Sequence, residues 1–264
     1  MRIPLFHVDA FACRAHSGNP AAVCLLDSWL DDELLRKVAA ENNLPATAFL
    51  VPADGGYRLR WFTTHCEIRL CGHASLAAGF VLLNLLQPSM EVARFETKHG
   101  GTLEVRRADQ AFEMNFPARP PKASPMGPDQ LIQATGIRTT PVEIVEANET
   151  WIAVFADASA VAAAVPDFEL LAKLHPYAVA ITAPGQPEDF VSRYFAPSYG
   201  IPEDQVTGSL HCALTPYWSR RLGKERLKAR QLSARGGELA CEMTGDRVLL
   251  TGNAILTMQG TMQI

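Results

Sequence analysis

The sequence predicts an α+β protein of two similar domains, each a strand-rich sheet or barrel wrapped around a central helix. Two largely apolar runs of helical length, residues 72–86 and 209–222, each follow a glycine-led start at Gly72 or Gly208. A run with little polar face predicts a helix buried on all sides. Residues 117–125 carry four prolines in nine positions and favour a domain boundary between the two runs. The alternative is two unrelated buried helices with ordinary glycine starts.

The first half alternates strand-like segments with a few helices. Residues 31–42 have apolar side chains at helical spacing, with acids in the first turn. The turn-rich string Ser17-Gly18-Asn19-Pro20 separates the first two strands. Strands are expected over residues 3–11, 21–26, 47–51, 57–63 and 112–116, with a hairpin over 95–106.

The second half repeats this pattern, so the predicted domains are residues 1–118 and 119–254. Pro216 is expected to bend the second apolar helix. Helices are expected over residues 128–135 and 158–174, and strands over 142–155, 178–182, 190–195 and onward through 249–264.

Composition excludes several classes of protein. The chain has 264 residues, 48% of them hydrophobic, and a net charge of -4, so it offers no basic field for nucleic acid or an anionic membrane. Its longest apolar stretch, residues 74–86, is about 13 residues and too short to span a bilayer. The first residues lack the apolar core of a secretory signal. Six cysteines without a compact framework indicate the cytoplasm.

The two glycine-led starts favour binding of a small carboxylate. A helix N-terminus presents unpaired amide groups and about half a positive charge, so it binds an anion without a basic side chain. Glycine lets the ligand approach that backbone closely. Two such ends facing one cleft would suit proton transfer next to a carboxylate, because the developing negative charge needs fixed donors.

Five strings of this sequence, in order and over nearly the whole chain, closely resemble the phenazine-biosynthesis PhzF-like family. They are Val8-Asp9-Ala10-Phe11, Gly18-Asn19-Pro20-Ala21-Ala22-Val23, Arg60-Trp61-Phe62-Thr63, Leu70-Cys71-Gly72-His73-Ala74 and Glu203-Asp204-Gln205-Val206-Thr207-Gly208-Ser209; Arg235-Gly236-Gly237 adds to the match. The resemblance implies the diaminopimelate-epimerase-like fold, a cleft between domains, cofactor-free isomerase chemistry and a homodimer. In that fold the last strand often packs back onto the first domain, which would take residues 255–264.

The resemblance also assigns roles to residues. It implies that His73 and Asp204 handle protons or orient the ligand. It implies that Gly72, Gly208 and Ser209, with the adjacent Thr207, bind the substrate carboxylate and that Asn19 shapes the site. Taken alone, each has a plainer interpretation: His73 a solvated residue at a helix start, Asp204 a turn or capping residue, and Ser209 a helix N-cap.

One position departs from the family. Isomerases of the family usually carry Ser-Glu-Thr-Ala-Phe, in which the glutamate is the main acid or base, whereas this chain reads Pro45-Ala46-Thr47-Ala48-Phe49. Since Ala46 cannot carry a proton, the usual mechanism should lose about 10² to 10⁴ in rate. Three accounts are open: a binding or vestigial member, proton transfer by another group such as His73 with Asp204, or an introduced substitution that traps a substrate.

Three other chemistries are less favoured. Cys71 stands where related epimerases have a catalytic thiol, but Gln205 occupies the place of its partner, so a small buried filler is the simpler interpretation. A zinc site of His65, Cys66, Cys71 and His73 lacks a usual ligand spacing. The sequence also contains no phosphate-binding loop motif.

The sequence therefore predicts an isomerase that acts on a small carboxylate-bearing metabolite, without cofactor or metal and without nucleic-acid or membrane partners. The hypothesis from a different class is a non-catalytic binder of a small metabolite, motivated by Ala46.

Overall fold

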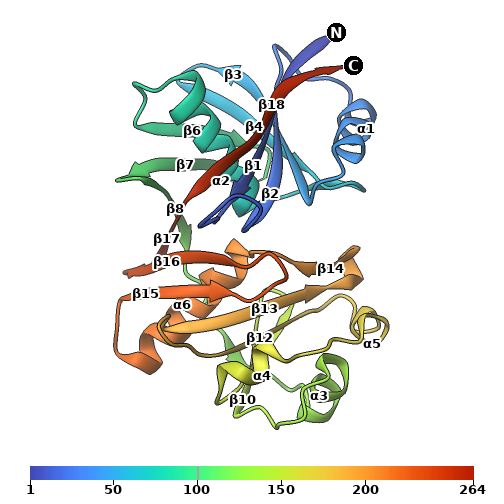
Figure 1. Ribbon diagram of the computed structural model, residues 1–264, viewed down its shortest axis with the longest axis vertical. Coiled ribbons are helices and arrows are strands. Elements are labelled where there is room, and N and C mark those ends of the chain that lie inside the picture. Colours follow the sequence, from blue (N-terminus) through green and yellow to red (C-terminus); the bar gives the residue numbers. More distant parts are fainter. Residues whose placement is uncertain (100) are drawn as a thin grey trace. The chain divides into compact units, whose positions relative to one another are not determined.

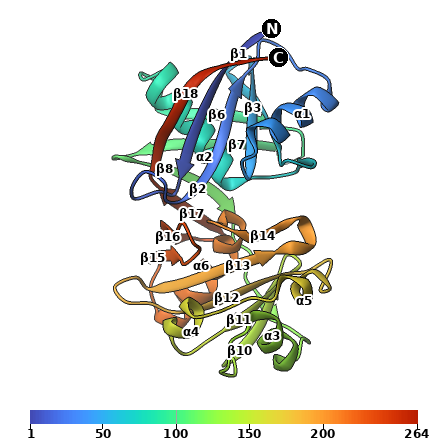
Figure 2. The same ribbon diagram turned by 45° about the vertical axis from the view of Figure 1, so that its right-hand side comes forward.

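The computed structural model describes residues 1–99 and 101–264. The chain folds into two compact units, one of Met1–Asn115 with Thr251–Ile264, the other of Phe116–Leu250. Each unit is a strand-rich sheet with one largely apolar central helix against its inner face, as the sequence predicted, and its other helices lie on the outer face (Figures 1 and 2). Residue 100, in the expected hairpin over 95–106, lies outside the described residues.

The first unit is built from one continuous ladder. Its order is β18, β1, β2, β3, β4, β6, β7 and β8; the β2–β3 and β4–β6 pairs are parallel and the others antiparallel. The strands are β1 (Arg2–Ala10), β2 (Asn19–Leu25), β3 (Ala46–Ala53), β4 (Gly56–Phe62), β5 (Glu67–Ile68, paired with β4), β6 (Val92–Thr97), β7 (Gly101–Ala108), β8 (Ala111–Pro117) and β18 (Ala254–Gln263).

The central helix of this unit is α2 (Gly72–Phe80), which continues as a π-helical turn, η1 (Val81–Leu86). The sequence predicted this helix but not its wider last turns. Every residue from His73 to Phe80 is buried, which explains the absence of a polar face. A Cβ on Gly79 would lie 2.4 Å from Val105 Cγ1 of β7, so glycine is required where the helix meets the sheet.

A second layer covers the outer face of the same sheet. Helix α1 (Asp32–Asn42) begins at Asp31, whose side chain accepts a hydrogen bond from Leu34 N at 2.8 Å. Its buried face, Leu35 with Val38 and Ala39, packs on outward-facing residues that include Cys24 and Phe49. Alternate residues of β2 and β3 therefore face α1, and the others face α2.

The second unit has the same plan. Its ladder runs β9, β10, β11, β12, β13, β15 and β16, with β11–β12 and β13–β15 parallel. The short strand β14 also pairs with β13. The strands are β9 (Lys122–Ala123), β10 (Glu143–Ala147), β11 (Thr150–Val154), β12 (Ala178–Pro184), β13 (Phe190–Ala196), β14 (Ile201–Asp204), β15 (Arg226–Gln231), β16 (Gly237–Thr244) and β17 (Arg247–Gly252).

The central helix of the second unit is α6 (Gly208–Leu222), which contains Pro216. Proline has no N–H to donate to the carbonyl of Cys212, one turn earlier. Arg119 N donates to that carbonyl at 2.9 Å instead, so the proline leaves no buried acceptor unsatisfied there. Trp218, further along the helix, stacks on Phe190 and donates from Nε1 to Thr182 Oγ1 at 3.0 Å.

Three short helices pack on the outer face of this sheet: α3 (Pro128–Thr135), α4 (Ala158–Ala162) and α5 (Phe168–Ala172). Leu131, Val161 and Leu171, one from each helix, pack with residues of β11, β12 and β13. The helices expected over residues 158–174 are α4 and α5, and Asp167 caps the second. Across the described residues, no helix has the length and apolar character needed to cross a membrane.

Acid is expected to destabilise the protein through His211, which is fully buried in α6. Burial lowers the pKa of His211 from 6.5 to about 4, against the opposing effect of the hydrogen bond to Thr207 O. The unfolded chain binds a proton near pH 6.5 whereas the folded chain does not, so the free energy of unfolding falls as the pH decreases from 6.5 towards 4.

We expect this loss to approach about 3 kcal/mol. Urea denaturation at pH 7.5 and 4.5 measures it, with His211→Leu as the comparison. The variant is expected to be less stable at pH 7.5 and to lose less stability on acidification. Equal pH dependence in both proteins would contradict the assignment.

Candidate active site

The first group of predicted site residues meets at the start of α2. His73 Nδ1 lies 3.2 Å from Asn19 Nδ2, the first residue of β2, although 54 positions separate the two in sequence. His73 is 7% exposed and Asn19 fully buried, so His73 is not the solvated residue that its position alone suggested. An amide nitrogen can only donate, so Nδ1 is the acceptor in this contact. We call Asn19, Cys71, Gly72 and His73 the first half-site.

The loop before β2 holds Asn19 in place. Asp9 on β1 is buried and accepts a hydrogen bond from His16 N at 2.8 Å. Ser17 Oγ donates to Arg14 O at 2.7 Å and closes the turn. Gly18 has φ +68°, and a Cβ there would lie 2.2 Å from Ala10 O, so no other residue fits. The Asp9 and Gly18 strings noted in the sequence thus build the turn that delivers Asn19.

Ala46, at the start of β3, belongs to the same face of the sheet. It pairs with Ala21 of β2, and Ala21 lies on the same side of that strand as Asn19. Ala46 is fully buried. A side chain at position 46 therefore projects on the inner face, the face from which Asn19 reaches His73.

Cys71 precedes α2 and contacts the imidazole ring of His73. Its Sγ lies 3.5 Å from Nδ1 and 3.8 Å from Nε2. The residue is buried. The alternative zinc ligands His65 and Cys66 are exposed in the β4–β5 turn, and among the described residues no three His, Cys, Asp or Glu side chains gather as metal ligands.

The second group meets at the start of α6. Thr207 is the N-cap residue, but among the described contacts its side chain makes no capping bond to the first turn. Its hydroxyl donates instead to Asp204 Oδ2 at 2.7 Å. Gly208 is buried, whereas Ser209 is exposed at the first turn. Asp204, Thr207, Gly208 and Ser209 form the second half-site, in which Thr207 holds a carboxylate beside the helix N-terminus.

Gln231, the last residue of β15, was not predicted from the sequence. Its side chain is fully buried. Oε1 accepts from Thr207 N at 2.9 Å, and Nε2 donates to Asp204 O at 2.7 Å and to Thr207 Oγ1 at 3.2 Å. The signal was present in residues 226–231, where charged residues alternate with Leu227, Ala229 and Gln231. A polar residue that ends an otherwise apolar face marks a buried polar contact.

Two further contacts fix the segment between Asp204 and α6. Ser233 Oγ donates to Gln205 O at 2.8 Å, and Arg235 N donates to Gln205 Oε1 at 3.2 Å. Gln205 thus anchors the segment where a second thiol would be needed for a two-thiol racemase. In the Arg235-Gly236-Gly237 string, Gly236 has φ +64° and its N–H donates to Ser233 O at 3.0 Å, which closes the turn after Gln231.

Tyr194 on β13 pairs with Asp204 in the ladder. Burial raises the pKa of Tyr194 to about 12, and the negative charge of Asp204 adds to the effect. Its hydroxyl, 3.5 Å from Thr150 Oγ1, therefore keeps its proton at neutral pH.

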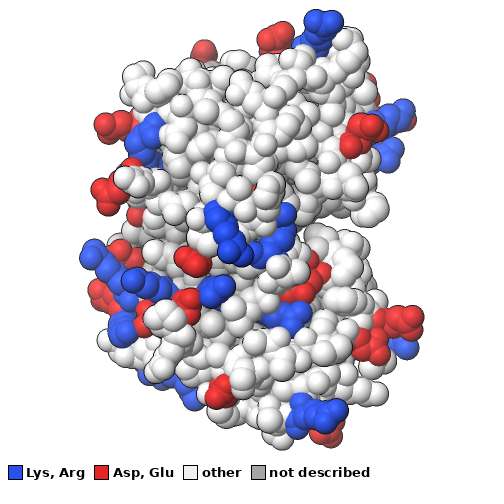
Figure 3. All heavy atoms as spheres, viewed as in Figure 1, with Lys and Arg blue, Asp and Glu red and all other residues white. Residues whose placement is uncertain are grey.

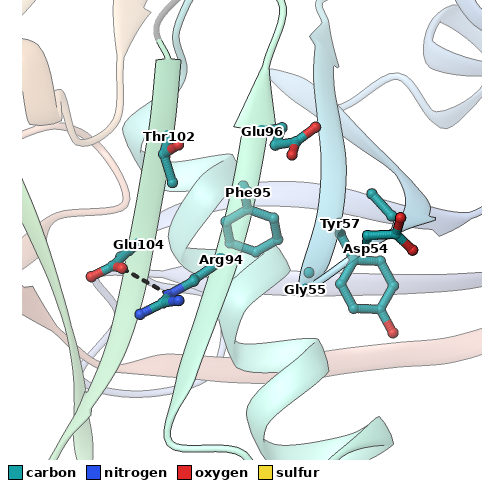
Figure 4. A pocket seen from close by; sticks show the side chains of 10 residues that line it. Asp54, Gly55, Tyr57, Arg94, Phe95, Glu96, Thr102 and Glu104 are labelled. Atoms are coloured by element: carbon teal, nitrogen blue, oxygen red, sulfur yellow. Dashed lines mark hydrogen bonds and ion pairs between the residues drawn. The ribbon is translucent and has the colours of Figure 1, made fainter.

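A cavity of about 380 Å³ in the first unit lies elsewhere. It is lined by the β3–β4 turn and by β6 and β7, where Arg94 Nε donates to Glu104 Oε1 at 3.0 Å (Figure 4). Its described lining residues include none of the predicted site residues. This cavity is therefore distinct from both groups of predicted site residues.

The chain is similar in sequence and in structure to known proteins. The family profile described as "Phenazine biosynthesis-like protein" matches residues 8–260. An uncharacterized isomerase of Pseudomonas aeruginosa is 48% identical over 100% of both chains. A crystal structure of a phenazine biosynthesis protein of the PhzF family from Enterococcus faecalis has 40% identity and a TM-score of 0.95, covering 100% of both chains. A probable proline racemase from Agrobacterium radiobacter shares the fold alone, at 14% identity and a TM-score of 0.61 over 99% of this chain and 92% of that one.

Proposed function

Because the chain belongs to the phenazine biosynthesis-like PhzF family, we propose that it is an isomerase that moves a proton within a small carboxylic acid. One observation supports this most: the two half-sites have the same construction. In each, a buried glycine-led helix begins beside a side chain that can carry a proton, His73 in one and Asp204 in the other. We propose that both half-sites act on one substrate.

Backbone amides are proposed to bind the substrate carboxylate. The amides of Gly72, Gly208 and Ser209 lie in the first turns of α2 and α6, where the helix dipole favours an anion. At the second half-site the Thr207 hydroxyl is directed to Asp204 and not to these amides. The net charge of -4 adds no general attraction for an acid, so these local donors must supply it.

His73 and Asp204 are proposed to transfer the proton. One removes a proton from a carbon next to the carboxylate or conjugated with it, and the amide donors stabilise the charge that develops on the carboxylate oxygens. The other returns a proton to a different carbon, or to the opposite face of the same carbon. One C–H bond breaks and one forms, so the reaction needs neither cofactor nor metal.

The absence of a carboxyl group at position 46 favours a second candidate, a non-catalytic binder of the same class of acid. Ala46 is fully buried on the inner face and has no proton to exchange. Under this alternative the half-sites bind the acid but leave its C–H bonds intact.

Solvent-deuterium exchange separates the two functions. The protein is incubated in D₂O with a panel of small carboxylic acids, both saturated and unsaturated and including amino and imino acids, and proton NMR follows each C–H signal. Exchange at a carbon supports the isomerase. Saturable binding without exchange supports the binder. If no acid of the panel binds or exchanges, both proposals are contradicted.

We also propose that the protein forms a homodimer through strand β18. β18 is ten residues long, pairs with β1, and carries no charged side chain; residues 257–261 are exposed. In the view of Figure 3 the face of the first unit over β18 is almost entirely uncharged. Natural proteins usually protect an exposed sheet edge with lysine or proline, and a second copy of this neutral strand would bring no buried charge.

Analytical ultracentrifugation tests this proposal. The parent is expected to sediment as a dimer and the Thr257→Lys, Thr261→Lys variant as a monomer, because added charges oppose edge pairing. The matched control places the same lysines at Thr139 and Thr140, two exposed threonines of the second unit, and should stay dimeric. A monomeric parent, or a dimeric β18 variant, would contradict the proposed interface.

A further inference from the structure

Gln231 is a fully buried polar side chain next to the second half-site. Its amide contacts two residues of the half-site, Thr207 and Asp204, through three hydrogen bonds of 2.7–3.2 Å. A buried amide without partners would be strongly unfavourable. Here both N–H groups and the carbonyl are used.

The orientation of this amide follows from its neighbours. Thr207 N–H can only donate, so it selects Oε1, and the Asp204 carbonyl can only accept, so it selects Nε2. The second hydrogen of Nε2 points to Thr207 Oγ1. Thr207 Oγ1 therefore accepts from Gln231, and its own hydrogen is directed to Asp204 Oδ2 at 2.7 Å.

Sheet topology brings these residues together. β14 and β15 pair with successive parts of the same strand, β13: Asp204 lies opposite Tyr194, and Gln231 lies opposite Ser192. Both strands thus end beside the start of α6. On β15, Leu227 and Ala229 are buried like Gln231 and alternate with exposed residues, so all three face inward. Gln231 is the member of this row that reaches the helix N-terminus.

We propose that Gln231 is a positioning residue for the second half-site. It holds Asp204 through the Asp204 carbonyl and through the hydroxyl of Thr207, and it fixes the peptide that leads into the carboxylate-binding amides. The inference rests on the proposed function, because it assigns to Asp204 a part in proton transfer. Gln231 acts through Asp204 and Thr207 and does not itself transfer a proton.

A double-mutant cycle tests whether Gln231 acts through Asp204. Gln231→Leu is made in the parent and in Asp204→Asn, and exchange into the acid with the fastest C–H exchange is measured. If the parent rate is too low, Ala46→Glu serves as the background for all variants. In the presence of Asp204 we expect Gln231→Leu to lower kcat about 10- to 100-fold, with KM changed less than about threefold. In Asp204→Asn the same change should lower kcat less than about twofold, because the carboxylate that Gln231 positions is already lost.

Thr182→Val is the matched control for lost packing and stability. Thr182 is equally buried in the same unit. Its hydroxyl donates to Val191 O at 2.7 Å and accepts from Nε1 of Trp218, in the second half of α6, at 3.0 Å. The Thr182→Val variant should lower the denaturation midpoint as Gln231→Leu does, but leave kcat within about twofold of the parent value. Equal losses of rate from Gln231→Leu with and without Asp204 would overturn the proposal.

Gln231→Glu separates the two contacts of the amide. It keeps an acceptor for Thr207 N–H but presents an oxygen to the Asp204 carbonyl, where a donor is needed. Hydrogen–deuterium exchange should show the Thr207 amide protected as in the parent in this variant, and exposed in Gln231→Leu. The segment over residues 204–206 should be loosened in both variants.

This exchange measurement needs no catalytic activity. If no acid shows C–H exchange, the proposed function fails, yet the amide data still test the positioning of residues 204–207. Parent-like protection of these residues in a folded Gln231→Leu protein would refute the positioning role alone.

Discussion

Replacing Ala46 with glutamate is expected to raise the rate of solvent-deuterium exchange about 10²- to 10⁴-fold, the usual contribution of a general acid or base. Position 46 projects on the inner face of the first unit. It pairs with Ala21 of β2, which lies two residues along that strand from Asn19, and Asn19 contacts His73. A carboxyl group there would supply the proton-carrying group that Ala46 lacks. The rate is measured with the acid that the parent protein binds most tightly.

Ala46→Gln is the matched control, because it adds nearly the same volume without a group that transfers protons. Both variants fill a fully buried position and should be destabilised by a similar amount. Denaturation curves establish that each is folded under assay conditions. If the folded Ala46→Glu variant catalyses C–H exchange no faster than Ala46→Gln, the missing glutamate does not limit the exchange rate of this protein.

Replacing Asp204 with asparagine is expected to lower the exchange rate about 10²- to 10⁴-fold. Asparagine keeps the shape of the side chain and can accept the Thr207 hydroxyl, which donates to Asp204 Oδ2 at 2.7 Å. Binding of the acid should therefore change little while proton transfer is lost. The variant is compared with whichever of the parent and Ala46→Glu has the higher rate.

Glu203→Gln provides the control from the neighbouring position. Glu203 precedes Asp204 on β14 but pairs with Arg193, at 2.7 and 2.9 Å from its two carboxylate oxygens. Removing its charge breaks a partly buried ion pair and should reduce stability, yet leave the exchange rate within about twofold. A similar loss of exchange rate in both variants would contradict a specific role of Asp204 in proton transfer.

The sequence predicted the fold because its largest signals are also the largest features of the structure. Two largely apolar runs became the central helices α2 and α6, and the outer helix α1 was predicted from apolar spacing and first-turn acids over residues 31–42. The sequence placed the domain boundary between residues 118 and 119, and the compact units divide between Asn115 and Phe116. β15 was missed because its exposed, charged face outweighs the short apolar one.

The candidate site was less accessible from the residues alone. The contact between Asn19 and His73 joins positions 54 apart, and only the resemblance to a family linked them. Gln231 belongs to no recognised string, and its role depends on β14 and β15 sharing one edge of β13. Local sequence patterns carry no information on such pairing. The roles assigned to His73, Asp204, the carboxylate-binding amides and Asn19, like the cytoplasmic location, stay predictions.

NMR titration of the amide signals with one exchange-competent or tightly bound small acid tests most directly whether both half-sites act on one ligand. We expect the amide signals of Gly72 and His73 and those of Gly208 and Ser209 to shift together, with one dissociation constant and one acid per chain. Shifts confined to one of the two helix starts, or two independent dissociation constants, would contradict it.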